Sequence, residues 1–93
     1  MEELIDEAAR LFDISRQELT GSSRTREVVL ARQAAVWALH KRYPDLTLVR
    51  IGELLGGRNH ATIIAAVARA EQLARTDQDY ARILEALVRS PLP

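Results

Sequence analysis

The chain has 93 residues, 47% of them hydrophobic, and a formal net charge of zero at pH 7. A chain of this length forms one domain around one small core, so we predict a single domain over residues 1–93. The absence of cysteine excludes disulfides, thiolate metal sites and a cysteine nucleophile. No apolar run approaches the roughly 20 residues that span a bilayer, and the acidic start Met1-Glu2-Glu3-Leu4 excludes a signal peptide. The sequence therefore predicts a cytoplasmic protein without a membrane partner.

The basic side chains are concentrated in the middle of the chain. Residues 1–23 carry two basic and six acidic side chains, residues 24–75 carry nine and four, and residues 76–93 carry two and three. A DNA-binding domain is usually basic, so the zero net charge by itself argues against nucleic acid. The local excess of +5 over residues 24–75 favours an anionic partner for that segment, although charges on a small helical protein also scatter unevenly by chance.

Apolar residues recur at helical spacing along the whole chain, and no stretch alternates at period two. A first helix has its apolar face at Leu4, Ile5, Ala8, Leu11 and Phe12. Ser15 and Glu18 form a capping-box pattern, which predicts a short second helix over residues 16–19 that ends near Gly21. Residues 20–25 are polar and form a loop.

Two further helices are marked by their ends. A long helix is predicted from Arg26 to Tyr43, and Pro44 ends it because the residue before a proline is pushed out of the helical region. Its core positions are Val28, Ala31, Ala35, Ala38 and Leu39. Thr76-Asp77 begins a last helix that frays by Ser90-Pro91. Its apolar face is Tyr80, Ile83, Leu84 and Leu87.

Residues 47–75 indicate two helices joined by a tight glycine turn. Thr47 can cap the first helix, and Gly56-Gly57 can adopt positive φ and redirect the chain. Asn59 is a good cap for the second helix. The inward residues of the two helices are Leu48, Ile51, Leu54 and Leu55, then Ile63, Val67, Ala70 and Leu73. The fold class is therefore all-α, a compact bundle of six helices with a helix-turn-helix at about 47–75.

Gly52 lies inside the first of these two helices. Glycine costs up to ~1 kcal/mol relative to alanine there. We therefore expect a packing reason, namely a neighbouring helix that approaches its bare backbone.

The first turn of the second helix carries the side chains that suggest DNA. A helix-turn-helix protein inserts the N-terminal residues of its second helix into the major groove. Asn59 and His60 offer hydrogen-bond donors and acceptors to base edges, and the methyl groups of Ala61 and Thr62 can touch a thymine methyl. Arg58, just before this turn, is placed for the DNA backbone or a base.

Other basic residues fit the DNA backbone and the minor groove. Arg69 lies further along the helix and is expected to meet a phosphate, which positions the protein without specifying sequence. Arg24-Thr25-Arg26 forms a flexible basic arm. Arms of this kind enter the minor groove, whose negative potential is strongest in A/T-rich sequence.

Plainer interpretations exist for the same residues. Asn59 can act only as a cap, His60 can be an ordinary surface residue, and Arg24 and Arg26 can be solvated loop charges. Trp37 is expected to pack in the core rather than stack on bases. The alternatives to specific DNA binding are a helical protein-interaction module and a weak, non-specific DNA binder.

An enzyme is the least favoured class. His40 and His60 have no local metal-ligand partner, and no GxxxxGK[ST] motif is present to hold a nucleotide triphosphate. We therefore predict no catalytic residue, metal, cofactor or small-molecule substrate.

The segment Gly56-Gly57-Arg58-Asn59-His60-Ala61-Thr62-Ile63 resembles the GGRDHTTV signature of the C-terminal DNA-binding domain (domain IV) of DnaA, the bacterial chromosomal replication initiator. Residues 48–52 match its L-x-x-I-G, and Arg32-Gln33 match the R-Q of its long helix. Arg24-Thr25-Arg26 lies where the family has a basic loop, and residues 12–19 fit its first two helices.

The resemblance implies a six-helix, Trp-repressor-like domain that binds a short, asymmetric, A/T-rich box in double-stranded DNA at replication origins. By position it places Asn59, His60 and Ala61 against major-groove bases. It places Val49 against a thymine methyl and Arg24 in the minor groove. It gives contacts with the DNA backbone to Arg32, Gln33, Thr62 and Arg69, and we add Arg26 and Arg58 to this set from their charge and position alone.

The sequence also departs from the family pattern. Asn59 replaces an aspartate and Ala61 a threonine. Aspartate accepts from cytosine N4 whereas asparagine prefers adenine, so we expect a shifted base preference or a lower specificity. Glu27 and Leu30 dilute a region that is usually more basic, and with the sequence pI of about 6.7 they predict a weaker binder.

The resemblance covers one domain of an initiator. We therefore expect either an excised domain or a stand-alone relative, associated with the nucleoid. A lone domain could bind boxes without oligomerising or melting DNA. Its further partners would be other initiator domains or the full-length initiator, with which it could compete.

Overall fold

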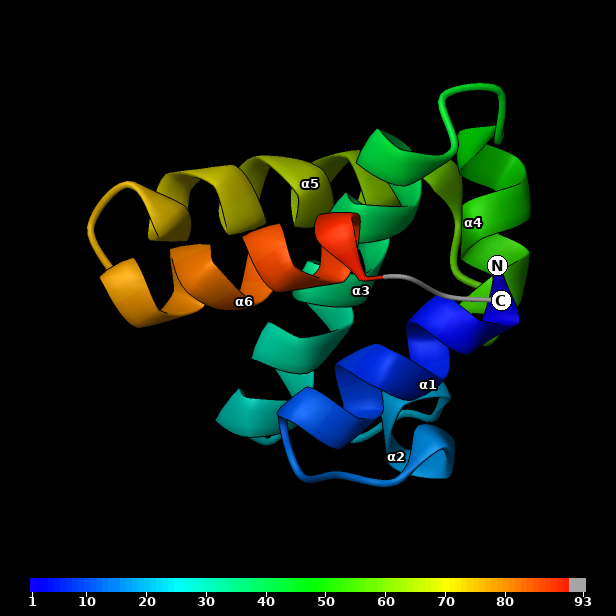
Figure 1. Ribbon diagram of the computed structural model, residues 1–93. Helices are drawn as coiled ribbons and strands as arrows, with labels where there is room; N and C mark the ends of the chain where they lie inside the picture. Colours follow the sequence, from blue (N-terminus) through cyan, green and yellow to red (C-terminus); the bar gives the residue numbers. More distant parts are fainter. Residues whose placement is uncertain (91–93) are drawn as a thin grey trace.

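Six α-helices follow one another along residues 1–90, the part of the chain that the computed structural model describes (Figure 1). They are α1 (Glu2–Leu11), α2 (Arg16–Thr20), α3 (Arg26–Arg42), α4 (Leu48–Leu54), α5 (His60–Ala74) and α6 (Gln78–Arg89). The predicted all-α class and the six helices are confirmed, with ends that differ by a residue at α2, α3 and α5. The last helix, α6, ends at Arg89. The fraying predicted at Ser90-Pro91 falls partly outside the described residues, because these end at Ser90.

Side-chain caps fix where most of these helices begin. In α2 the capping box is complete, because the Glu18 amide donates to Ser15 Oγ and the Ser15 amide donates to Glu18 Oε1, both at 3.0 Å. Thr47 accepts from the amide of Arg50 at 3.1 Å and so caps α4. Asn59 and Asp77 cap α5 and α6 in the same way. The caps at Ser15, Thr47 and Asn59 were predicted from sequence, and for α6 the start at Thr76-Asp77 was predicted without a named cap.

The long helix α3 runs through the middle of the domain and packs against the other five helices. Figure 1 shows α1 and α2 around its lower end, with α5 and α6 side by side across its upper end. The buried side of α3 is rich in small residues, namely Ala31, Ala34, Ala35 and Ala38. Small side chains let the neighbouring helices pack close to the α3 backbone.

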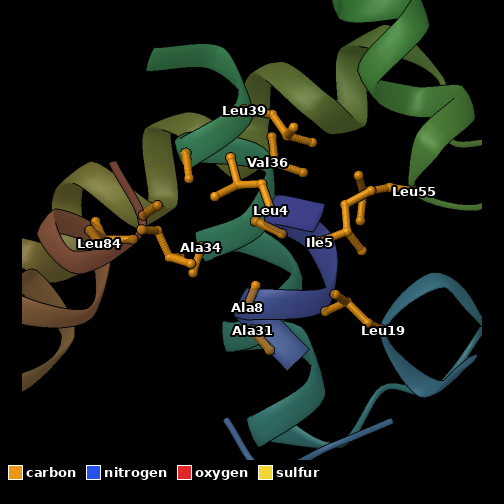
Figure 2. Packing of buried hydrophobic residues seen from close by; sticks show 14 of the residues in the cluster. Leu4, Ile5, Ala8, Leu19, Ala31, Ala34, Val36, Leu39, Leu55 and Leu84 are labelled. Atoms are coloured by element: carbon orange, nitrogen blue, oxygen red, sulfur yellow. The ribbon is translucent and has the colours of Figure 1, made fainter. Parts of the chain in front are cut away.

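The core side chains of different helices point toward one another (Figure 2). Leu4 and Ile5 of α1 meet Leu39 of α3 and Leu55, which follows α4, and all four are fully buried. The five core positions predicted for α3 are buried as expected. Several other predicted core residues, Leu11, Phe12, Leu48, Leu54, Val67, Leu73 and Ile83, lie at the rim and are only partly buried. Trp37 packs against the same cluster, in agreement with its structural interpretation.

Within residues 1–90, no helix is both long enough and apolar enough to cross a bilayer.

Candidate nucleic-acid interface

The turn between α4 and α5 is built from glycine positions. Gly56 and Gly57 have φ values of 89° and 85°, which other residues rarely adopt. The amides of Gly57 and Arg58 both donate to the carbonyl of Gly52 at 2.9 Å and fold the turn back on α4. These bonds hold α5 at a fixed direction from α4, as a helix-turn-helix requires.

Gly52 is buried because this turn lies directly against it. A Cβ at Gly52 would overlap the carbonyl oxygen of Arg58 and would touch the side chain of Ile63. The expected close approach therefore exists, but the prediction that a neighbouring helix makes it is wrong. The backbone that fills the space is that of the turn itself.

The first turn of α5 is open to solvent. Asn59, His60, Ala61 and Thr62 are all exposed, and the Asn59 side chain accepts the Thr62 amide at 2.9 Å. Val49 of α4 is 60% exposed, which is unusual for a large hydrophobic side chain in this domain. The first turn of a helix also has free amides and a partial positive charge, so it favours an approaching phosphate.

Two adjoining hollows bring other predicted site residues together. Gln33 of α3 and Thr62 and Arg69 of α5 line a hollow of about 290 Å³ between these helices. Gln33 and Arg69 also line a second hollow of about 410 Å³ with Arg24 and Arg26. We call Arg24, Arg26, Gln33, Thr62 and Arg69 the basic face. No acidic residue lines either hollow.

The positive charge of the basic face is not neutralised by neighbouring carboxylates within the described residues. Of the ion pairs formed within residues 1–90, none includes Arg24, Arg26 or Arg69. At the opposite extreme, Arg16 is held by both Glu2 and Asp6. The fold thus separates neutralised arginines on α1 and α2 from unpaired ones on the basic face.

Arg32 also lines the first hollow, as does Arg58, but its donors are used within the protein. Its guanidinium donates to the carbonyls of Leu19 at 2.8 Å, Ser23 and Gly21 at 3.1 Å, and Glu18 at 3.2 Å. These carbonyls belong to the last turn of α2 and the loop after it, where helical partners run out. Arg32 therefore closes the C-terminus of α2.

Arg58 supplies the second half of this cap from the helix-turn-helix. It donates to the carbonyls of Gly21 at 2.5 Å and Thr20 at 3.3 Å, and also to that of Leu55. Burial lowers the pKa of both guanidinium groups, and the charge of Arg58 lowers the pKa of Arg32 further. Gly56 permits this arrangement, because a Cβ there would overlap the carbonyl of Thr20. We call Arg32 and Arg58 the carbonyl clamp.

The carbonyl clamp is a role that the sequence did not predict. Both arginines were assigned to the DNA backbone, yet their donors are directed to the protein's own carbonyls. The short α2 ending at Gly21 was the available signal, because its last carbonyls need partners. The sequence around α2 does not indicate that the partners are arginines that lie 11 and 37 residues after Gly21.

The remaining predicted residues stay outside the basic face. Val49, Asn59, His60 and Ala61 line neither of its two hollows, although Ala61 directly precedes Thr62. Within residues 1–90, no cluster of three or more histidine, aspartate or glutamate side chains is placed to hold a metal ion.

Comparison with known proteins decides the family. Residues 1–70, which contain α1 to α4, the glycine turn and most of α5, match the family model described as the bacterial dnaA protein helix-turn-helix. The chain belongs to this family. The resemblance predicted from the glycine turn is therefore confirmed, and the clamp and the basic face both lie within the matched residues.

Individual DnaA proteins are similar over most of the chain. The chromosomal replication initiator protein DnaA of Thermus thermophilus is 39% identical over 85 residues, which are 91% of this chain and 19% of that protein. The DnaA of Bartonella quintana is 40% identical over 89 residues, 96% of this chain and 18% of its own length. The DnaA of Thermomicrobium roseum is 43% identical over 67 residues, 72% and 14% of the two chains. The chain thus spans about a fifth of the length of the first two relatives and 14% of the third.

Proposed function

We propose that this DnaA helix-turn-helix domain binds double-stranded DNA, with the first turn of α5 in the major groove and the loop of residues 20–25 in the minor groove. The observation that carries the proposal is the basic face. Arg24 and Arg26 lie just before and at the start of α3 and Arg69 lies 43 residues later in α5, yet the three share one surface without carboxylate partners and adjoin Thr62 in the first turn of α5. A DNA backbone is the polyanion that such a surface suits.

The proposed interface residues contact different parts of the DNA, namely base edges, phosphates and the minor groove. Asn59, His60 and Ala61, together with Val49, face base edges, because they are exposed at the starts of α5 and α4. Arg26, Gln33, Thr62 and Arg69 hold phosphates, and Arg24 enters the minor groove from its loop. Arg32 and Arg58 act first as the carbonyl clamp, and any contact they make with the backbone is additional.

The biological role proposed here follows from the relatives. They are named chromosomal replication initiator proteins, so we assign this domain to an A/T-rich, DnaA-box-like site in the initiation of replication or its regulation. The domain supplies binding and no catalysis. Other initiator domains, or a full-length initiator with which the domain competes for boxes, are the proposed protein partners, and the nucleoid is the proposed location.

Fluorescence anisotropy with a DnaA-box duplex and a scrambled duplex tests this function at two salt concentrations. We expect tighter binding to the box, and weaker binding to both duplexes at higher salt, because phosphate contacts release counterions. Equal binding to the two duplexes would reduce the function to non-specific binding. No binding at low salt would overturn the proposal and leave the protein-interaction alternative.

A further inference from the structure

The side-chain amide of Asn59 has two ends of opposite hydrogen-bonding character, and the fold uses one of them. Its Oδ1 accepts the backbone amide of Thr62 at 2.9 Å and caps α5. Only the oxygen of a side-chain amide can accept a hydrogen bond, so the donor on Thr62 fixes which end points into the helix. Nδ2 donates to no group within residues 1–90, and Asn59 is exposed.

The cap therefore leaves Asn59 with an outward NH₂ group. A free asparagine reads adenine with both ends at once, donating to N7 and accepting from N6. That pairing needs the oxygen and the nitrogen side by side along one base edge. The oxygen of Asn59 faces the helix instead, so the adenine preference expected from residue type alone does not follow from the folded domain.

We infer that Asn59 is a specificity-determining residue that selects a base with acceptors on its major-groove edge, guanine before all others. The inference rests on the proposed function. Guanine presents two acceptors, O6 and N7, and thymine presents one, O4. Cytosine presents the N4 donor, which opposes the Asn59 NH₂ group, and adenine presents a single acceptor, N7, beside its N6 donor, so both suit that group less well than guanine does.

Arg58 and Ala61, which flank the start of α5, do not supply a second donor of this kind. Arg58, the nearest cation in sequence, is committed to the carbonyls of Thr20, Gly21 and Leu55. Ala61 carries only a methyl group. Polar base recognition at the start of α5 thus falls to Asn59 and His60.

The variant Asn59→Asp tests the inference with the smallest possible change. Aspartate caps a helix as well as asparagine does, so the fold is retained, while its outer group becomes an acceptor instead of a donor. Asn59→Ser is the matched control, because serine also caps a helix but has no second polar group to offer. Thermal unfolding followed by circular dichroism checks that the three proteins are equally folded.

The three proteins are used to select from a library of double-stranded DNA with a randomised central segment, and the bound duplexes are sequenced. We expect the natural protein to enrich guanine at one position by roughly three- to tenfold, the range that a single hydrogen bond supplies. Asn59→Asp should enrich cytosine at that same position, and Asn59→Ser should flatten it. Each preference is a ratio within one protein, so the uniform loss of affinity caused by the added negative charge cancels.

Two outcomes would overturn the inference alone. In the first, the natural protein selects adenine over guanine at the position that Asn59→Asp changes. In the second, Asn59→Asp selects the same bases as the natural protein at every position. If the natural protein enriches no duplex at all, the proposed function fails and the inference fails with it.

Discussion

The five arginines of residues 24–75 that the sequence assigned to DNA form two groups with the same chemistry and different hydrogen-bond partners. Arg24, Arg26 and Arg69 are exposed and have no carboxylate partner within the described residues. Arg32 and Arg58 are half-buried and donate to backbone carbonyls. The first group offers charge and hydrogen bonds to a ligand, whereas the second organises the surface that presents them. The net charge of residues 24–75 does not show which arginines bind a ligand and which hold the surface in place.

The carbonyl clamp joins the two parts of the candidate interface. Arg32 of α3 and Arg58 of the glycine turn both donate to the carbonyl of Gly21. Residues 18–23 are thereby fixed between the helix-turn-helix and α3, directly before Arg24. The relative position of the loop before Arg24 and the first turn of α5, which we propose for the minor and the major groove, thus depends on two half-buried side chains.

The largest expected effect comes from filling the space beside the clamp. Gly56→Ala should lower the free energy of unfolding by about 3 kcal/mol or more, because a strained positive φ is combined with overlap of the Thr20 carbonyl. Gly57→Ala is the matched control. Gly57 has nearly the same φ but open space around its Cβ position, so we expect only the strain of about 1–2 kcal/mol. Urea unfolding followed by circular dichroism measures both, and equal losses would contradict the close approach of Thr20.

Removing an arginine of the clamp should come next. Arg58→Ala leaves part-buried carbonyls without a donor and should cost about 1–3 kcal/mol in the free energy of unfolding. Arg58→Lys should recover little of this loss, because an ammonium group lacks the planar fork that reaches several carbonyls. Arg24→Ala should leave unfolding unchanged, since Arg24 is exposed. An Arg58→Ala protein as stable as the natural one would show that the clamp contributes nothing.

Local rules predicted most of the fold. At four helix starts a side chain accepts the backbone amide three positions later, namely at Ser15, Thr47, Asn59 and Asp77. Both partners of such a bond lie within four consecutive residues, so a local sequence pattern is enough to predict it. The glycine turn is likewise local, because positive φ at Gly56 and Gly57 is a property of residue type.

The clamp was missed because it is long-range. Arg58 meets Gly21 across 37 positions, and no periodicity or motif records which carbonyls a helix end leaves open to a distant side chain. The same limit explains Gly52. Its position in a helix predicted a close contact, but the partner, the Arg58 carbonyl, became visible only in three dimensions. Base contacts by Val49, Asn59, His60 and Ala61 remain predictions.

The salt dependence of DNA binding separates the two groups of arginines directly. Arg24→Ala and Arg69→Ala should each reduce the slope of log K against log salt by about 0.9, the contribution of one phosphate-neutralising charge. Gln33→Ala removes a polar contact without charge and should weaken binding while leaving the slope unchanged. Anisotropy titrations over a salt series provide these slopes. An unchanged slope in both arginine variants would place the DNA elsewhere on the domain.

The smallest effect is expected at the acidic end of the molecule, where Arg16 bridges Glu2 and Asp6. Surface ion pairs contribute about 0–1 kcal/mol, so Arg16→Ala should barely change the free energy of unfolding. Arg16→Ala and Arg26→Ala remove the same single charge, and only Arg26 lines the basic face. We expect Arg26→Ala alone to weaken DNA binding at moderate salt, because Arg16 is paired with Glu2 and Asp6 and lines neither hollow of the basic face. Equal losses of affinity would mean that net charge, rather than the unpaired arginines of the basic face, controls binding.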